Sequence, residues 1–466
     1  MIRIFVSSNY IEEKKYIIDI IFNEFLGLEY KIVEGISEQK FTVIDYHGKI
    51  IRLKDILFLK KSNIWLKKES LPNLPLKRIN IKKFFPNYKG ESVMPLIYSD
   101  NHEIPFQINE TYININFDIL GSCFFMLTRY EEYVIKKRDS LDRFSYSDSL
   151  SYKENIIERP IVNEYVELLW HILHKINPFI KKKERTFNLV LTHDIDKPFG
   201  MMYDSNKQIL RHFAGDLLIR KDVKLFFKRF QEVFLLKFKQ KKYIEIKLKT
   251  YDYIFHISKK YNYKNYFFFM NSKKSWFDGN YKVDEPYVIE LIRDIIKKGH
   301  YVGLHPSFNS YKNKNELNNE VEHFNKILLC NNLPKITGAR QHYLRWSNPI
   351  TWRIYEKENL LYDSSLTFHD HAGFRCGTCY EFSTFDLEER KHMKLKEKPL
   401  IVMDTTLIEY MKLNNNEIVE YIMYLFKVCK FYNGDFVILW HNTTLDDSNN
   451  RKIYTELLMR IYNDGK

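Results

Sequence analysis

The chain has 466 residues, of which 45% are hydrophobic and 16% aromatic, so it can bury real cores and a disordered protein is excluded as the default. At this length we expect two domains. The formal net charge of +14 suits nucleic acid, an anionic membrane or an acidic substrate, and it selects none of them. The five cysteines are an odd, sparse set, which argues against a disulfide framework and for a reducing compartment.

Two features of the sequence predict a cytoplasmic location. The amino-terminal residues do not form a basic segment followed by an apolar run, as a signal peptide would. No apolar stretch approaches the length of a membrane-spanning helix. We therefore expect a cytoplasmic protein, with the inner face of the membrane as a place of peripheral contact.

Residues 1–180 are predicted to form a small α+β domain of unknown role. The elements expected from hydrophobic periodicity are a strand at 2–7, an amphipathic helix at 11–25, a hairpin at 41–53 that turns at His47-Gly48, a strand at 94–98, and helices at 117–133 and 161–175. A proline and a cluster of lysines within 175–184 then mark the boundary to a second domain at 186–466.

Strand and helix patterns alternate after this boundary. The expected strands are 187–192, 265–270, 301–304, 335–339, 400–403 and 435–440, and the expected helices are about 250–261, 286–298, 314–330, 349–358 and 416–431. Alternation of this kind favours a parallel sheet or a barrel.

A basic insertion at 207–249 separates the first two of these strands. Lysine and arginine alternate there with Leu, Phe and Ile at near-helical spacing. Such a segment can lie on an anionic membrane as an amphipathic helix. It can equally be a solvated helical hairpin that covers the barrel, and the sequence leaves both interpretations open.

Two carboxylates, Asp194 and Asp196, follow the apolar run that ends at Leu191. In a strand, residues i and i+2 point to the same side, so both side chains can face one site. One carboxylate could bind a metal while the other handles a proton. The alternative is an Asp-rich turn closed by Pro198.

Polar residues also end four other predicted strands. His305 follows 301–304, Arg340-Gln-His-Tyr343 follows 335–339, and Trp440-His441 closes 435–440, while Asp404 follows 400–403. A single histidine is more often structural than functional. Because enzyme sites on α/β barrels are assembled from several strand ends, the coincidence predicts one shared site.

These motifs resemble those of the polysaccharide deacetylase superfamily, the NodB-homology or carbohydrate esterase family 4-like group. The resemblance covers about 187–445 and is carried by Thr192–Asp196, Leu304-His305, Arg340–Tyr343 and Leu439–His441. Two further runs, Tyr362-Asp-Ser-Ser365 and Gly373-Phe-Arg-Cys-Gly-Thr378, resemble substrate-loop segments of a bacterial subgroup with an extra uncharacterised N-terminal domain. The fold that it implies is an irregular (β/α) barrel of the NodB-homology type preceded by a smaller α+β domain.

The resemblance also implies roles for the strand-end residues. Asp194 would be the catalytic base, Arg340 would orient that base, and His441 would be the general acid. Asp196 and His305 would be metal ligands. A backbone N–H near Tyr343 would help to hold the oxyanion, and Tyr343 and Trp440 are counted among the substrate-binding residues.

The sequence departs from the family pattern at two positions. Asn309 stands where the family usually has a second ligand histidine, and His342 stands where it usually has proline. We hypothesise that His342 replaces the missing ligand, so that Asp196, His305 and His342 hold a divalent metal. Zn²⁺ is preferred, although this ligand set also suits other first-row metals. The competing hypothesis is a degenerate site that only binds sugar.

The segment 362–379 is predicted to be a long functional loop, because it is dense in polar residues and glycine. His369 and His371 could reach the sugar or the metal, and Arg375 could clamp a carboxylate or phosphate of the substrate. The alternative is a structural loop packed over the barrel mouth.

The activity implied by the resemblance is a metal-dependent hydrolase that removes an acetyl group from an N-acetylated sugar, in surface-polysaccharide or glycolipid precursor metabolism. A nucleotide-linked or lipid-linked sugar would be the substrate, and nucleic acid is not expected as a partner. The alternative is a catalytically decayed barrel that acts as a carbohydrate-binding or scaffold protein.

Overall fold

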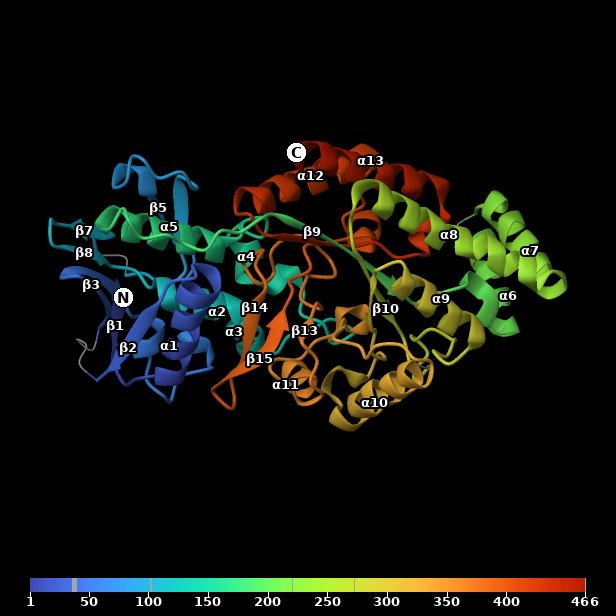
Figure 1. Cartoon of the computed structure of the whole chain (residues 1–466), viewed down its shortest axis with the longest axis horizontal. Helices are drawn as coiled ribbons and strands as arrows, with labels where there is room; N and C mark the ends of the chain where they lie inside the picture. Colours follow the sequence, from blue (N-terminus) through green and yellow to red (C-terminus); the bar gives the residue numbers. More distant parts are fainter. Residues whose placement is uncertain (36–39, 101–102, 220, 272, 466) are drawn as a thin grey trace. The chain divides into compact units, whose positions relative to one another are not determined.

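Helices and strands are mixed along the whole chain, whose computed structural model describes residues 1–35, 40–100, 103–219, 221–271 and 273–465 (Figure 1). The chain packs as two units, of which unit 1 holds Met1–Asn188, Leu344–Ile401 and Lys427–Phe436, and unit 2 holds Leu189–Tyr343, Val402–Phe426 and Val437–Lys466. Packing units need not coincide with folding domains, so the predicted division into 1–180 and 186–466 stays a prediction.

Unit 1 contains a six-stranded sheet in the order β2-β1-β3-β4-β8-β7. Its strands are β1 (Ile2–Val6), β2 (Tyr30–Glu34), β3 (Phe41–Tyr46), β4 (Lys49–Lys54), β7 (Phe106–Ile108) and β8 (Tyr112–Ile115). The predicted hairpin is confirmed, because β3 and β4 pair antiparallel around His47 and Gly48. Both turn residues have positive φ, 51° and 82°, as a two-residue hairpin turn requires.

The helices of the amino-terminal region are α1 (Ile11–Ile18), α2 (Ile119–Leu127), α3 (Tyr130–Val134), α4 (Leu150–Lys153) and α5 (Ile161–Ile176). The predicted helix 11–25 continues from α1 as a π-helical segment, Asp19–Phe25. The helix expected over 117–133 is broken at Arg129, which adopts φ 51°. The Arg129 side chain is fully buried in ion pairs with Glu131 and Glu132, which accounts for the break.

Several further elements of unit 1 were not predicted from the sequence. These strands are β5 (Lys77–Asn80), β13 (Tyr362–Asp363), β14 (Phe382–Asp386) and β15 (Lys391–Glu397), whereas β6 (Val93–Leu96) overlaps the strand expected at 94–98. The predicted helix at 349–358 is confirmed as α11 (Ile350–Lys357). The alternation along β15 is hard to see because its exposed positions are lysine and histidine, which read as a charged loop.

Unit 2 is built on strands in the order β12-β11-β10-β9-β17-β16. These are β9 (Asn188–Ile195), β10 (Asn265–Phe269), β11 (Tyr301–Leu304), β12 (Gly338–Ala339), β16 (Val402–Met403) and β17 (Asp435–Leu439). The pairs β9/β10, β10/β11, β11/β12 and β16/β17 are parallel. All six strands were expected, but β12 and β16 are shorter than predicted.

The helices of this part of the chain are α9 (Pro286–Lys297), α10 (Lys314–Cys330), α12 (Asn415–Phe431) and α13 (Ser448–Gly465), of which only α13 was unexpected. The chain therefore has the mixed α/β character that was predicted. Within unit 2 the row of described strands ends at β12 and β16 and forms no closed ring, so the predicted barrel is not confirmed.

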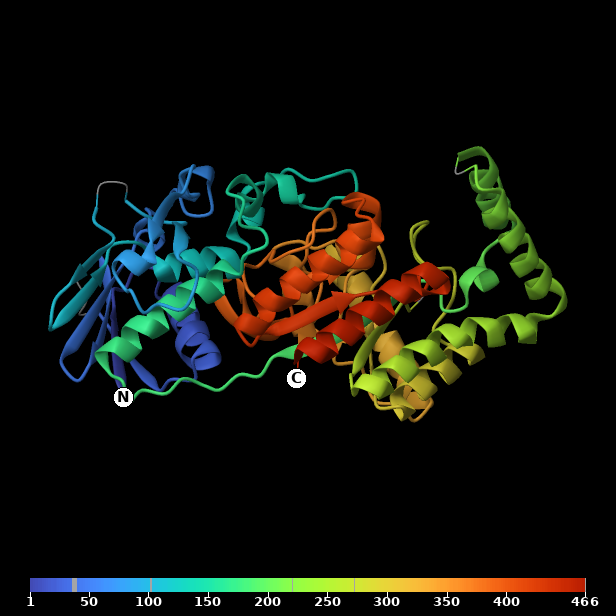
Figure 2. The same ribbon diagram turned by 90° about the horizontal axis from the view of Figure 1, so that it is seen from above.

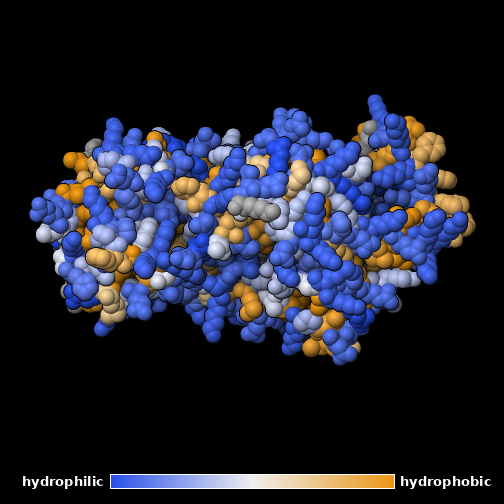
Figure 3. All heavy atoms as spheres, turned by 45° about the horizontal axis from the view of Figure 1, so that its top comes forward, coloured by the Kyte–Doolittle hydropathy of each residue, from blue (hydrophilic) through white to orange (hydrophobic). Residues whose placement is uncertain are grey.

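The basic insertion forms α6 (Asn206–Ala214), α7 (Val223–Phe238) and the first turns of α8 (Gln240–Tyr261). The helix expected at 250–261 begins earlier because Tyr243 and Ile244 are already buried. Figure 2 shows α7 standing away from the sheet of its unit. Figure 3 shows hydrophobic side chains at the surface where α6 and α7 lie. In the part of the chain that the structure describes, no helix is long and apolar enough to span a membrane.

Candidate metal centre

The polar residues that follow three parallel strands of unit 2 lie at one edge of its sheet. Asp194 is the second-last residue of β9, and Asp196 directly follows that strand. His305 directly follows β11. Arg340 and His342 come after β12, and the Arg340 N–H donates to the Leu304 carbonyl. Parallel strands share one direction, so these side chains, predicted from separate segments, meet in space.

Asp196, His305 and His342 form a compact group whose nearest nitrogen and oxygen atoms all lie within 4.8 Å of one another. His305 Nε2 is 3.3 Å and His342 Nε2 is 3.7 Å from Asp196 Oδ1. That oxygen is buried and accepts no hydrogen bond from any described residue. A buried, unsatisfied carboxylate oxygen needs an explanation, and a bound cation is a common one. Two imidazoles and one carboxylate are a donor set that fits a divalent metal with open positions.

Both imidazoles are held with their Nε2 atoms directed at Asp196. His305 Nδ1 donates to the Arg340 carbonyl at 2.6 Å, and His342 Nδ1 donates to Asp278 Oδ1 at 3.2 Å. With the proton on Nδ1, the lone pair of each ring lies on Nε2. Hydrogen bonding of the second ring nitrogen to a carbonyl or carboxylate is the arrangement that orients metal-binding histidines.

Asp278 was not predicted from the sequence. It also accepts hydrogen bonds from the backbone N–H groups of Lys274, Ser275 and Phe308. These bonds and the His342 imidazole outweigh burial and hold the pKa of Asp278 below its usual value. The residue is followed by Gly279, and Asp-Gly reads as an ordinary turn, so the sequence carries no signal of its contact with His342.

The electrostatics of the group favour a cation. Burial raises the pKa of Asp196, but the neighbouring imidazoles of His305 and His342 lower it more, so the carboxylate stays ionised. Burial lowers the pKa of His305, but the carboxylates of Asp194 and Asp196 raise it above its usual value. Two carboxylates thus create a negative potential where the imidazole nitrogens converge, and a divalent ion would satisfy it.

Asp194 is fixed beside this group by Arg340. The Asp194 side chain is 3% exposed, and the guanidinium of Arg340 is fully buried. Arg340 Nη1 donates to Asp194 Oδ1 at 3.2 Å and to Thr192 Oγ1 at 2.6 Å. The other carboxylate oxygen, Asp194 Oδ2, lies 3.9 Å from His305 Nε2. Asp194 is therefore held in a single orientation with one oxygen turned toward the centre.

His441 and Asp404 form a second pair at the ends of the parallel strands β17 and β16. His441 Nδ1 donates to Asp404 Oδ1 at 2.7 Å, and the His441 backbone N–H donates to Asp404 Oδ2 at 2.9 Å. Burial lowers the pKa of His441, but Asp404 outweighs it and raises the pKa to about 10, with contributions from Asp196 and Asp194. His441 is thus protonated at neutral pH and lies within electrostatic reach of both aspartates.

Two residues of unit 2 were predicted to bind substrate, and they differ in solvent exposure. Tyr343 is 37% exposed, adopts φ 59°, and packs its ring edge-on against Phe277 and Phe308 at 5.6 and 5.5 Å between centroids. Trp440 is 1% exposed and packs on Tyr454. Only Tyr343 can present a ring to a ligand here, and the structure does not support substrate contact by Trp440.

The three residues predicted from the 362–379 loop lie in unit 1 and are not grouped with the metal ligands. His369 is 3.4 Å from Asp139, and His371 stacks on Tyr146 at 4.8 Å. Arg375 is 3% exposed. Each side chain is engaged within its own unit, so a role in the centre stays a prediction for all three.

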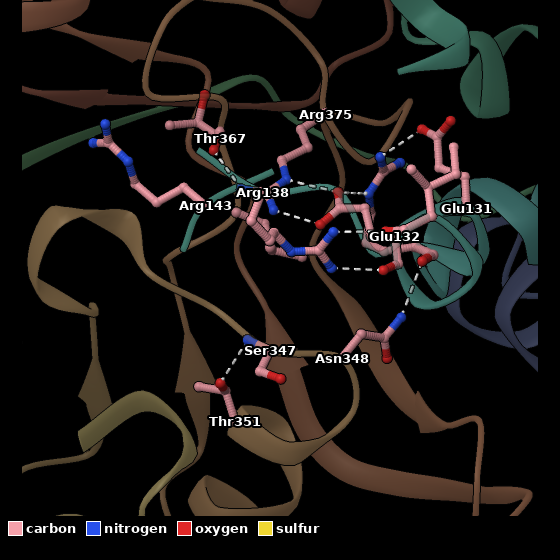
Figure 4. Close-up of polar contacts among 12 residues, drawn as sticks. Glu131, Glu132, Arg138, Arg143, Ser347, Asn348, Thr351, Thr367 and Arg375 are labelled. Carbon is pink, nitrogen blue, oxygen red and sulfur yellow. Dashed lines mark hydrogen bonds and ion pairs between the residues drawn. The ribbon is translucent and has the colours of Figure 1, made fainter. Parts of the chain in front are cut away.

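Arg375 belongs to a buried ion-pair network in which Glu132 links two arginines (Figure 4). Arg375 binds both Glu132 oxygens, at 2.9 and 2.6 Å, and donates to the Thr367 carbonyl at 2.7 Å. Arg129 contacts the same carboxylate at 2.8 Å. Burial raises the pKa of Glu132, but the two guanidinium groups lower it to about 2. The fork of Arg375 already holds a carboxylate of the protein, which argues against the predicted substrate clamp.

Comparisons with known proteins find one family model and several solved structures that are similar to parts of the chain. Residues 2–178 match a family of unknown function (DUF7033). No curated protein matches the chain. Among solved structures it is similar to a polysaccharide deacetylase from Mycobacterium smegmatis, with 15% identity, a TM-score of 0.40, and 60% of this chain and 85% of that chain covered.

Two further solved structures show comparable likeness. A polysaccharide deacetylase from Pseudomonas aeruginosa PAO1 has 11% identity and a TM-score of 0.34, with 59% of this chain and 84% of that chain covered. A family 4 carbohydrate esterase from Streptomyces lividans, in complex with acetate, has 10% identity and a TM-score of 0.29, with 60% and 90% covered. Likeness at this level transfers no catalytic residue to the chain.

The Arg375 network generates a stability prediction. Replacing Arg375 by Met leaves the Glu132 carboxylate buried with one of its two partners gone, and we expect a loss of about 3–5 kcal/mol in the free energy of unfolding. Arg460→Met is the matched control, since Arg460 contacts Glu420 at the same 2.6 Å but at the surface. The control should lose no more than about 1 kcal/mol. Urea unfolding followed by circular dichroism measures both, and equal losses would contradict the structural role.

The His441–Asp404 pair generates a prediction on pH. Because the pKa of His441 is raised from 6.5 to about 10, its contribution to stability is fully present below pH 6.5 and disappears as the pH rises through about 10. Asp404→Asn removes the main cause, so the pKa should fall toward 6.5. Histidine NMR titration of the protein stripped with a chelator measures this, with the exposed Asp252→Asn as control. An unchanged His441 titration in Asp404→Asn would contradict the assignment.

Proposed function

We propose that the chain is a divalent-metal-dependent hydrolase that removes an acetyl group from an N-acetylated sugar. The observation that carries this proposal is Asp196 Oδ1, a buried carboxylate oxygen without a hydrogen bond that faces the Nε2 atoms of His305 and His342. These three residues would hold the ion, and Zn²⁺ suits them well. When bound, the ion supplies Lewis acidity toward an acyl oxygen and toward water.

In this mechanism Asp194 acts as the general base. Arg340 donates to Oδ1 of Asp194, which leaves Oδ2 on the side of His305. From there the carboxylate removes a proton from the water that attacks the acetyl carbon. The salt bridge to Arg340 fixes the orientation of the base, so little rotational freedom is lost when the substrate binds.

His441 acts as the general acid. The carboxylate of Asp404 keeps its imidazole protonated, so it can donate a proton to the amine nitrogen as the carbon–nitrogen bond breaks. The products are acetate and a free amino sugar. A backbone N–H near Tyr343, where the chain turns through a positive φ, would stabilise the oxyanion that forms on the acetyl group.

The class of substrate follows from two features. The motifs at Thr192–Asp196, Leu304-His305 and Leu439–His441 resemble those of deacetylases that act on carbohydrate. The exposed face of Tyr343, supported by Phe277 and Phe308, offers an aromatic surface on which a sugar ring can pack. A cytoplasmic precursor of a surface polysaccharide or glycolipid is the substrate proposed.

One observation favours a second function, a carbohydrate-binding or scaffold protein without catalysis. Asn309 occupies the position where the related motif carries a second ligand histidine, and it is exposed rather than directed into the group of three. If His342 does not compensate for it, the centre would bind sugar but not activate water.

Acetate release from N-acetylglucosamine oligosaccharides by the Zn²⁺-loaded protein tests the proposal. Asp194→Asn removes the base and His441→Gln removes the acid, and each should lower kcat/KM by about 10²–10⁴-fold. Asp252→Asn, at an exposed position of α8, is the matched control and should keep full activity. Full hydrolysis by Asp194→Asn would overturn the mechanism. Sugar binding without hydrolysis by the metal-loaded wild type would favour the scaffold.

A further inference from the structure

Helix α7 carries an apolar stripe that nothing else in the described chain covers. Its members recur every three or four residues, so they lie on one face, and we call them the α7 stripe: Val223, Phe227, Phe230, Phe234 and Phe238. They are 56, 59, 56, 49 and 72% exposed, and none of the residues described in α7 is buried. Phenylalanine side chains are usually buried, so four exposed phenylalanines on one helix face are unusual.

The apolar surface continues into the segment before α7. Leu217, Leu218 and Ile219 are 43, 76 and 83% exposed. Figure 3 shows hydrophobic side chains exposed in this region, bordered by hydrophilic ones. Monomeric proteins rarely expose apolar patches of this extent unless the patch binds a partner or a membrane.

Lysines surround the α7 stripe and have few acidic neighbours. Those in or next to α7 that are exposed are Lys221, Lys224, Lys228, Lys237, Lys239, Lys241 and Lys242. The acidic residues between 216 and 239 are already engaged in the fold: Asp216 pairs with Arg229, Asp222 caps α7, and Glu232 contacts Lys247. The surface therefore combines positive charge with exposed aromatic side chains.

We propose that α7 docks on the surface of an anionic lipid bilayer. The stripe would enter the boundary between headgroups and acyl chains, and the lysines would contact the lipid phosphates. This partner explains both features at once, because the exposed aliphatic side chains of Leu218, Ile219 and Val223 offer no flat face on which a nucleic-acid base could stack. The stripe is confined to one face of a single helix, which suits a helix lying in the plane of the membrane.

Helix α6, which precedes α7 in the chain, is connected to the candidate metal centre within unit 2. The Arg211 guanidinium on α6 lies over the Trp276 ring at 4.8 Å, and Asn280 donates to Gln208 of the same helix at 3.1 Å. The next residue, Phe277, packs against Tyr343 beside the centre. Docking would therefore hold the centre near the membrane, and, resting on the function proposed above, it points to a lipid-linked acetylated sugar as substrate.

Sedimentation of the full chain with vesicles tests the docking proposal. The wild type should bind vesicles of phosphatidylcholine mixed with phosphatidylglycerol, bind far less to phosphatidylcholine alone, and release as salt is raised. In the triple variant Phe227→Gln/Phe230→Gln/Phe234→Gln, the affinity for the anionic vesicles should fall by about tenfold or more. The matched control is Phe431→Gln, which changes a phenylalanine of α12 that is 57% exposed.

A second triple variant tests the charges. Lys224→Glu/Lys228→Glu/Lys237→Glu should lose binding to the anionic vesicles, whereas Lys31→Glu/Lys82→Glu/Lys83→Glu, at exposed positions of unit 1, should keep most of it. Unchanged far-ultraviolet circular dichroism shows that the variants are folded.

Several outcomes would overturn the proposal. These are no binding by the wild type, full binding by the phenylalanine variant, or a dimer in light scattering that this variant abolishes, which would make a second copy the partner of the stripe. Asp194→Asn should bind vesicles like the wild type, and the phenylalanine variant should still release acetate from soluble oligosaccharides. Failure of docking can thus be distinguished from failure of the proposed catalysis.

Discussion

The candidate metal centre depends on Asp196 Oδ1, a buried carboxylate oxygen that accepts no hydrogen bond from the described residues. A buried carboxylate oxygen without a hydrogen bond costs free energy, and here it lies 3.3 and 3.7 Å from the Nε2 atoms of His305 and His342. A divalent cation removes this cost, because it binds the oxygen and both nitrogen lone pairs. The surrounding contacts, from the Arg340 carbonyl to Asp278, are those that would hold such a ligand set in place.

The sheet of unit 2 explains how distant segments supply this group. Its parallel strands end at one edge, so the segments at the ends of β9, β11 and β12 bring Asp196, His305 and His342 together. The same logic places His441 beside Asp404, at the ends of β17 and β16. Two carboxylates, Asp194 and Asp196, thus lie near His305. A third, Asp404, keeps His441 protonated.

The sequence predicted those parts of the site that follow an apolar strand, since Asp194, His305 and His441 each stand where such a run ends. It could not predict Asp278, whose contact with His342 depends on how a loop folds back. Nor could it predict that Arg375 pairs with Glu132, because a loop arginine that faces a ligand and one that neutralises a buried carboxylate look alike in sequence. The barrel was expected from the family resemblance and from the alternation of strands and helices, and neither determines whether this sheet closes.

Isothermal calorimetry of Zn²⁺ added to the chelator-treated protein measures whether Asp196, His305 and His342 bind a metal ion. The wild type should bind about one ion per chain, His342→Ala should bind it far more weakly, and Asp278→Asn should lose about 10–100-fold in affinity. His256→Ala, at an exposed position of α8, should match the wild type. Equal affinity of His342→Ala and the wild type, or no Zn²⁺ binding by either, would contradict the account.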